Sequence, residues 1–190
     1  LSQTSAELGQ EVSAKANHTV IVAGSIGPTG EILSPIGDLS EALAIEIFHE
    51  QAEGLKAGGA DVLWIETISA KEEFISAVKA AELANMPWCG TMSFDSSGRT
   101  MMGFTSTQMT TLIQTLNKNL IAYGANCGVG ASDLLRTVLG FEKTKYPLIA
   151  KGNAGIPKYK DGHIHYDGTP ELMADYACLA RDSGAKIIGG

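Results

Sequence analysis

The chain has few cysteines, few basic residues and no long apolar segment. Its 3 cysteines form no Cys-x-x-Cys pair, which argues against a disulfide framework and favours the reducing cytoplasm. No run approaches the ~20 apolar residues of a membrane span, and residues 1–7 lack the basic and apolar regions of a signal peptide. The net charge of −7 argues against nucleic-acid and anionic-membrane partners, which require clustered positive charge. A small molecule is the expected partner.

What the chain does have is enough apolar material for one sizeable core. It contains 190 residues, of which 44% are hydrophobic and 18% charged, so we expect residues 1–190 to belong to a single folded domain. The first residue is Leu1 and not Met, and the sequence ends at Gly190, together with its last apolar run. We therefore expect the sequence to be part of a longer protein. The oligomeric state is left open, a homo-oligomer included.

Apolar runs alternate with amphipathic stretches along the whole chain. The runs are rarely interrupted by polar residues, as is typical of parallel strands that are buried on both faces, and they cover residues 19–24, 61–66, 88–94, 120–127, 147–152 and 186–190. Amphipathic helices are predicted over residues 39–56, 72–85, 133–139 and 170–181, with Thr169 as the N-cap of the last one. In the first of these helices we expect Leu43, Ile47 and Leu55 to face the core.

This alternation predicts an α/β fold, either a doubly wound sheet or a (β/α)8 barrel. No Gly-x-Gly-x-x-Gly follows the first apolar run, which weakens the dinucleotide-binding alternative. About six β/α units are present, two fewer than a closed barrel contains. In both architectures the functional residues lie at the carboxyl ends of the strands.

Polar residues collect at the predicted strand ends. Taken singly, Ser25, Thr67 and Ser93 are equally compatible with helix caps and turns. Glu66 is more specific, because a carboxylate that follows Val-Leu-Trp-Ile directly is expected to be partly desolvated and to need a cationic partner, such as a ligand amino group. The other polar strand ends are Asn126-Cys127 and Asn153-Ala154-Gly155.

The cysteines and histidines divide into one candidate and several weaker ones. Cys127 lies at a strand end, where it is either a reactive thiol or a small packed hydrophobe. Cys89 and Cys178 fall inside a predicted strand and helix, so we expect both to be packing residues. His163 and His165 have the spacing of a metal pair, but the stretch around them, residues 158–168, resembles a solvated loop.

Five ordered motifs resemble the homocysteine S-methyltransferase family over essentially the whole chain. They are Gly-Ser-Ile-Gly-Pro at 24–28, Trp-Ile-Glu-Thr at 64–67, Gly-Ala-Asn-Cys-Gly at 124–128, Gly-Asn-Ala-Gly-Ile-Pro at 152–157 and Ile-Ile-Gly-Gly at 187–190. The resemblance implies a (β/α)8 barrel that binds Zn²⁺ through three thiolates. It implies that Cys127 is the first zinc ligand and that two further cysteines follow Gly190.

The resemblance also implies roles for the other strand-end residues. Glu66 matches the acid that binds the amino group of homocysteine, and Asn153 matches the residue that can occupy the fourth zinc position until substrate arrives. Ser25 and Thr67 are expected to bind substrate beside Glu66. No residue is expected to act as a catalytic acid or base, because zinc binding itself removes the thiol proton.

The expected reaction is methyl transfer to homocysteine, which gives methionine. Segments 90–95, 99–103 and 164–176 look most like bacterial betaine-type members, which favours betaine or another methylated onium donor. The alternative within the family is the homocysteine module of a cobalamin- and folate-dependent methionine synthase. Two alternatives of other classes are a metal-free amino-acid-binding protein and a lyase or aldolase that uses Lys151 as a Schiff-base nucleophile.

Overall fold

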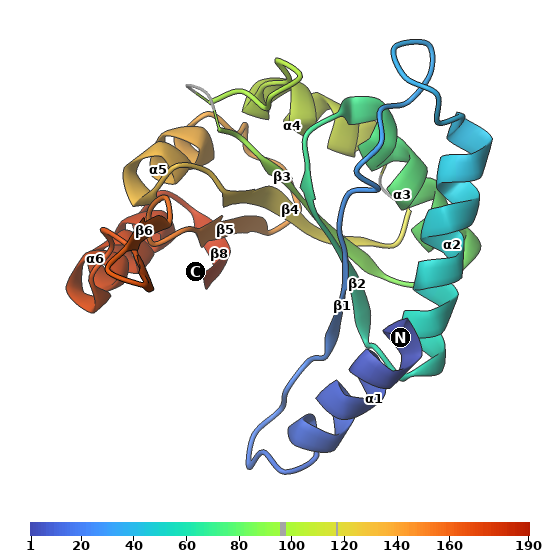
Figure 1. Cartoon of the computed structure of the whole chain (residues 1–190), viewed down its shortest axis with the longest axis horizontal. Coiled ribbons are helices and arrows are strands. Elements are labelled where there is room, and N and C mark those ends of the chain that lie inside the picture. Colours follow the sequence, from blue (N-terminus) through green and yellow to red (C-terminus); the bar gives the residue numbers. More distant parts are fainter. Residues whose placement is uncertain (96–97, 117) are drawn as a thin grey trace. The chain divides into compact units, whose positions relative to one another are not determined.

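The computed structural model describes residues 1–95, 98–116 and 118–190. Six strands form one parallel sheet in the order β1-β2-β3-β4-β5-β8, and β6 and β7 form a separate antiparallel hairpin. The elements in chain order are α1 (Ser2–Ser13), β1 (Ala23–Ile26), α2 (Glu41–Ala57), β2 (Val62–Ile68), α3 (Lys71–Leu83), β3 (Trp88–Ser93), α4 (Ser106–Thr115), β4 (Leu120–Cys127), α5 (Ala131–Leu139), β5 (Leu148–Gly152), β6 (Lys158–Lys160), β7 (His163–His165), α6 (Pro170–Asp182) and β8 (Ala185–Gly189) (Figure 1). This arrangement confirms the predicted α/β fold with six β/α units.

The chain divides into two compact units. The N-terminal unit comprises Leu1–Gly90 and Leu116–Ile121, and the C-terminal unit comprises Thr91–Thr115 and Ala122–Gly190. Strands β3 and β4 each begin in the first unit and end in the second. Every side-chain arrangement below lies within one unit.

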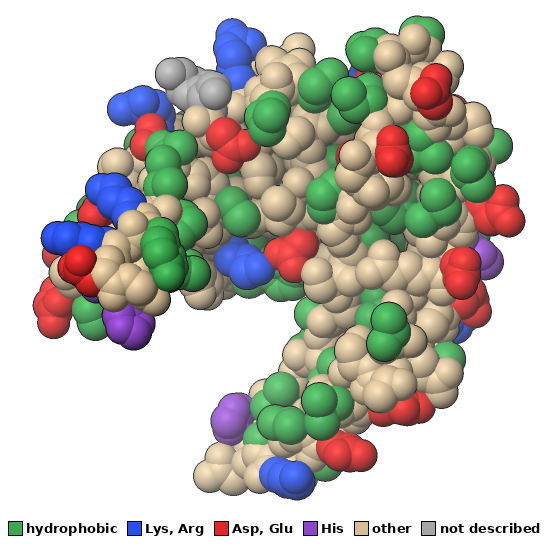
Figure 2. All heavy atoms as spheres, in the orientation of Figure 1, with side chains coloured by type: hydrophobic (Ala, Val, Ile, Leu, Met, Phe, Trp, Pro, Cys, Tyr) green, Lys and Arg blue, Asp and Glu red, His purple; other side chains and the backbone are tan. Residues whose placement is uncertain are grey.

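The N-terminal unit packs α2 and α3 beside the parallel pair β1 and β2 (Figure 1). Its core contains Phe48, Leu63 and Ile65, all almost fully buried, and an edge-to-face pair between Phe74 and Trp88 with ring centroids 6.1 Å apart. Helix α2 begins where the Ser40 side chain accepts a hydrogen bond from the Leu43 N–H at 3.2 Å, and Figure 2 shows acidic side chains over its outer side.

The C-terminal unit packs α5 and α6 beside β4, β5 and β8. Tyr123 and Phe94 both contact Phe141 edge-on, with ring centroids 5.5 and 5.9 Å apart. Helix α6 begins as predicted: the Thr169 side chain accepts from the Leu172 N–H at 3.2 Å, and Pro170 occupies the first turn. The proline fits there because the first helical N–H needs no intrahelical partner.

The structure corrects several expected element boundaries. The first strand begins at Ala23 rather than at residue 19, and Val20 and Ile21 are exposed. Helices α1 and α4 were not predicted: α1 buries only the small Ala6, and the buried face of α4 includes the polar residues Ser106 and Thr110. Residues 158–165 form the exposed β6–β7 hairpin instead of a loop.

The buried face of α2 also differs from the expected one. Leu43 and Ile47 are about half exposed, and the buried residues are Ala44, Phe48, Ala52 and Leu55. The small alanines allow close helix packing, which a count of large apolar residues does not detect. None of the helices in the part of the chain described here is long and apolar enough to cross a bilayer.

Candidate functional site

In the N-terminal unit, Glu66 accepts a hydrogen bond from the neighbouring strand. The Ser25 Oγ donates to Glu66 Oε1 at 2.7 Å, and the parallel register of β1 and β2 pairs Ser25 with Trp64. Side chains two residues apart on a strand share a face, so Glu66 lies on the same face as Trp64 and Ser25. Gln51 of α2 donates to the Ser25 carbonyl at 3.1 Å, which fixes the backbone from which the serine hydroxyl extends.

Glu66 is half-buried and lies next to a backbone outlier. Thr67 has a φ of 66°, a conformation that costs a β-branched residue of the order of 1–3 kcal/mol. Both residues lie inside the last part of β2 and not beyond its end. Strain of this kind persists only where the surroundings impose it, which supports a functional interpretation of the Glu66-Thr67 pair.

A second carboxylate binds the loop that follows β1. Glu73, in the first turn of α3, accepts from both the N–H and the hydroxyl of Thr29, at 2.8 and 2.7 Å. Only 5% of Glu73 is exposed. Sequence reasoning missed this residue because an acid in the first turn of a helix is usually explained by the helix dipole.

In the C-terminal unit, Cys127 ends β4 in the left-handed region, with a φ of 59°. The residue is half-buried, and the Asn126 amide nitrogen lies 3.0 Å from its Sγ as a donor. Asn126 itself is only 1% exposed. The contact places an N–H donor against the sulfur, which is the atom through which a cysteine binds a metal.

Asn153 lies beside the same turn. Its backbone N–H donates to the Cys127 carbonyl at 3.4 Å, and its side-chain amide donates to the Gly128 carbonyl at 3.1 Å. The structure therefore brings Cys127 and Asn153 together in one unit and Ser25 and Glu66 together in the other. The role of Asn126 was not predicted, although its position next to the cysteine was the available signal.

The remaining cysteines, histidines and Ser93 do not join either group of site residues. Cys89 is buried, as expected of a packing residue, whereas Cys178 is exposed on α6, so that expectation was wrong. His163 and His165 are exposed on the hairpin. Ser93 is 4% exposed, and its Oγ has no hydrogen-bond partner among the described residues. Within that same part of the chain, no cluster of three His, Cys, Asp or Glu side chains could bind a metal.

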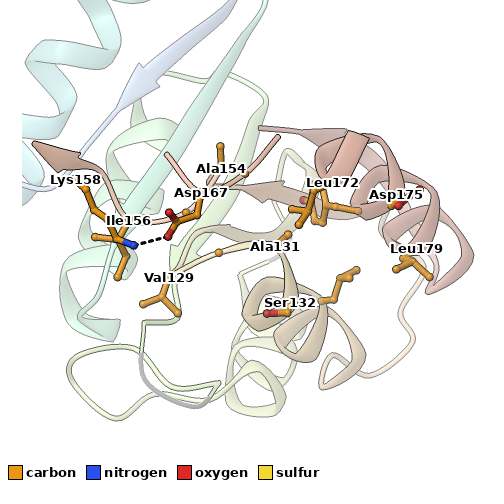
Figure 3. Close-up of a pocket in the computed structure, with 15 residues that line it drawn as sticks. Val129, Ala131, Ser132, Ala154, Ile156, Lys158, Asp167, Leu172, Asp175 and Leu179 are labelled. Carbon is orange, nitrogen blue, oxygen red and sulfur yellow. Dashed lines mark hydrogen bonds and ion pairs between the residues drawn. The ribbon is translucent and has the colours of Figure 1, made fainter. Parts of the chain in front are cut away.

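A hollow of about 460 Å³ lies beside α5 and α6 in the C-terminal unit. Its walls are mainly apolar, with Leu172 and Leu179 from α6 and Ile156 from the loop after β5 (Figure 3). An ion pair of 2.7 Å between Lys158 and Asp167 lies at its side. Ser25, Glu66, Thr67, Cys127 and Asn153 do not line it, although Ala154, Gly155 and Ile156 of the 152–157 motif do.

Comparison with known proteins identifies the family. The homocysteine S-methyltransferase family matches this chain over residues 1–190. The chain belongs to that family. The resemblance inferred from the five motifs is thereby confirmed.

Related proteins of this homocysteine S-methyltransferase family are distant in sequence but share the fold. Methionine synthase of Mycobacterium tuberculosis strain H37Rv is 24% identical over 177 residues, which cover 89% of this chain but only 15% of that protein. The apo form of homocysteine methyltransferase MmuM from Escherichia coli has a TM-score of 0.76 at 22% identity, over 100% of this chain and 67% of MmuM. A metallated form of MmuM has a TM-score of 0.66 at 23% identity, over 98% and 60%.

Proposed function

We propose that this chain supplies the substrate-binding and metal-binding residues of a zinc-dependent homocysteine S-methyltransferase. In the reaction, the sulfur of homocysteine forms a bond to a methyl carbon, the bond between that carbon and the donor breaks, and the thiol proton is released. The observation that carries the proposal is Cys127, a half-buried thiol at the carboxyl end of β4 with an amide donor 3.0 Å from its sulfur. Family membership makes a metal ligand the most economical role for such a thiol.

The residues present fit zinc as part of a ligand set. Cys127 supplies one thiolate, and the side-chain oxygen of Asn153 is the atom that would serve as an exchangeable fourth ligand. Register pairs Cys127 with Gly152 on β5 and Lys151 with Gly189 on β8. The end of β8 therefore lies level with Cys127, with strand β5 between them. This position suits the two further cysteines expected directly after Gly190.

Bound zinc supplies one piece of chemistry: it removes the proton of a coordinated thiol, whose pKa is otherwise ~8.5. The chain's own residues bind and orient the substrate. Glu66 accepts from the substrate ammonium, and the Ser25 hydroxyl fixes the direction of that carboxylate. The Asn126 amide donates to the Cys127 sulfur and orients that side chain. Catalysis of this type depends on positioning more than on proton transfer.

The methyl donor in this proposal is betaine or a related onium compound, because an activated positive centre makes the methyl group electrophilic. A second candidate is favoured by one observation: methionine synthases are among the relatives of this chain. The chain would then be the homocysteine module of a larger protein whose methyl group comes from cobalamin and folate. A metal-free homocysteine-binding protein is the remaining alternative.

The test is a methyl-transfer assay with the complete, zinc-loaded natural protein. L-homocysteine is supplied with betaine, S-methylmethionine or methylcobalamin in separate reactions, each with a deuterated methyl group, and labelled methionine is measured by mass spectrometry. Label from an onium donor supports the proposal, whereas label from methylcobalamin alone supports the methionine synthase alternative. If homocysteine binds tightly in the absence of zinc and no donor yields labelled methionine, both transferase proposals are contradicted. That result would favour the metal-free homocysteine-binding protein.

A further inference from the structure

Glu73 is a buried carboxylate for which the proposed reaction has no use. It lies in the first turn of α3, is 5% exposed and accepts both donors of Thr29 on a single oxygen, Oε1. Glu72, the residue before it, is also acidic but points into solvent. Burial of a carboxylate is unfavourable unless hydrogen-bond donors compensate it. The two hydrogen bonds from Thr29 therefore offset the cost of burying Glu73.

The energetics of the contact favour a fixed loop. Hydrogen bonds to an ionised acceptor are shorter and roughly twice as strong as neutral ones, and the α3 N-terminus adds a partial positive charge near Glu73. Helix α3 has no side-chain cap of its own at Ala70. The Thr29 hydroxyl also accepts from the Glu31 N–H at 3.2 Å, so one side chain organises both halves of the turn.

The rest of this loop is loosely packed. A Cβ added at Gly27 or Gly30 would meet no described atom within 4 Å, and Pro28 is exposed. The loop leaves the sheet at Ile26, which is fully buried. We call the contact between Thr29 and Glu73 the clamp. Residues 27–30 have open space around them, so loss of the clamp would free this segment.

Strand β1, which leads directly into this loop, carries the donor to Glu66. Ser25 binds Glu66 through its hydroxyl at 2.7 Å and binds Gln51 through its carbonyl at 3.1 Å. Only Ile26 lies between Ser25 and the open segment, residues 27–30. A loop that moves at Thr29 would therefore alter the surroundings of Glu66 without removing any group that contacts the substrate.

We propose that Glu73 is a positioning residue that fixes residues 27–30 through Thr29, so that the Ser25–Glu66 pair discriminates an amino-bearing thiol from one that lacks the amino group. This inference rests on the proposed function. It predicts that the clamp acts on recognition of the ammonium group and has little effect on binding of the thiol.

The test compares two ligands on the complete zinc-loaded protein by isothermal titration calorimetry: L-homocysteine and 4-mercaptobutanoate, which is homocysteine without its amino group. In Thr29→Val, which keeps the shape but loses the hydroxyl, we expect homocysteine to bind about 10-fold more weakly, the size of one lost charge-assisted hydrogen bond. Binding of 4-mercaptobutanoate should change less than about 2-fold. Thr29→Ser and Glu72→Gln should both keep the wild-type ratio between the affinities for L-homocysteine and 4-mercaptobutanoate.

The outcomes separate the inference from the proposed function. A fall in homocysteine affinity alone supports the clamp, and an equal fall for both ligands, or no change for either, overturns it. If the wild-type protein binds neither thiol, the proposed function is wrong and the inference falls with it. Should Thr29→Val fail to fold, Glu73→Gln offers the same comparison, since it keeps the side-chain shape and an acceptor oxygen but removes the charge.

Discussion

The carboxylate Glu66 and the thiol Cys127 are fixed in different ways. Glu66 accepts from Ser25, which lies 41 residues earlier on another strand, and the nearby loop depends on a third element through Glu73. Cys127 accepts from its own neighbour Asn126 and ends its strand in a left-handed turn. The Glu66 carboxylate thus takes its donor from another strand, whereas the Cys127 sulfur takes its donor from the adjacent residue.

This difference predicts how each region fails. Changes around Glu66 should give graded losses, because several elements share the task. Loss of the Cys127 thiol should give an all-or-none loss, because the proposed zinc site takes one of its three thiolates from this residue. The following predictions test that contrast, in order of decreasing effect.

Cys127→Ser should reduce zinc affinity by at least ~100-fold, because a hydroxyl is a much poorer zinc ligand than a thiolate. The measurement is zinc content after dialysis against a competing chelator. Cys178→Ser is the matched control: that cysteine is exposed on α6, and its replacement should leave zinc content unchanged. Full zinc occupancy in Cys127→Ser would show that Cys127 is no ligand.

Glu66→Gln should weaken homocysteine binding by about 10- to 100-fold, the cost of losing one hydrogen bond between charged groups. The change should appear in KM, with zinc content unaffected, since zinc is bound by other residues. Exposed Glu46→Gln on α2 serves as the control. A loss of zinc in Glu66→Gln would contradict the proposal that Glu66 binds the substrate and takes no part in zinc binding.

Gly124→Ala should destabilise the protein by about 2 kcal/mol, because an added Cβ would overlap the Ile149 backbone on the neighbouring strand β5. Gly27→Ala, with open space around its Cβ position, should change stability by no more than about 0.5 kcal/mol. Urea unfolding monitored by circular dichroism measures both. Equal effects would remove the contrast between the packed strand beside Cys127 and the open loop near Glu66.

Tyr176 gives a smaller, pH-dependent effect in the C-terminal unit. Burial raises the pKa of Tyr176 to about 12 from an ordinary 10.0, and its hydroxyl donates to the Gly189 carbonyl at 3.4 Å. The stabilisation is fully present below about pH 10 and is lost as the pH rises through about 12, because the folded state retains a proton that the unfolded state has released.

Between pH 9 and 11.5 the wild type should therefore lose about 1–2 kcal/mol more stability than Tyr176→Phe, as measured by urea unfolding. Tyr166→Phe, at an exposed position of the chain, should follow the wild type. If Tyr176→Phe loses stability in parallel with the wild type, Tyr176 of α6 is not the titrating group.

The sequence was sufficient for the six parallel strands and for the strand end at Cys127, because buried parallel strands are continuous apolar runs that stop at polar residues. The second strand was predicted too short, since β2 continues past Glu66 to Ile68. It was insufficient where packing overrides composition. Ala44 and Ala52 define the buried face of α2 in place of the larger Leu43 and Ile47. The first strand begins late because the Asp61 carboxylate, at 2.7 Å, binds the Val22 N–H.

The site was predictable to a similar extent. Ser25 and Glu66 were both expected among the substrate-binding residues and lie in hydrogen-bond contact, and Asn153 lies beside Cys127; their roles in binding stay predictions. The contact between Glu73 and Thr29 could not be predicted, since it joins a loop to a helix 44 residues later and nothing in an acidic first turn distinguishes a buried Glu73 from an exposed Glu72. Local turns are encoded in a few residues, whereas such clamps require the assembled fold.

The most direct test of the account is zinc K-edge X-ray absorption on the complete protein, with and without L-homocysteine, in the wild type and in Cys127→Ser. We predict that the number of sulfur neighbours of zinc rises by one when homocysteine is added to the wild type, and that Cys127→Ser has one fewer sulfur neighbour or no bound zinc. A zinc shell that neither homocysteine nor the loss of Cys127 changes would contradict the claim that this thiol forms part of a substrate-activating metal centre.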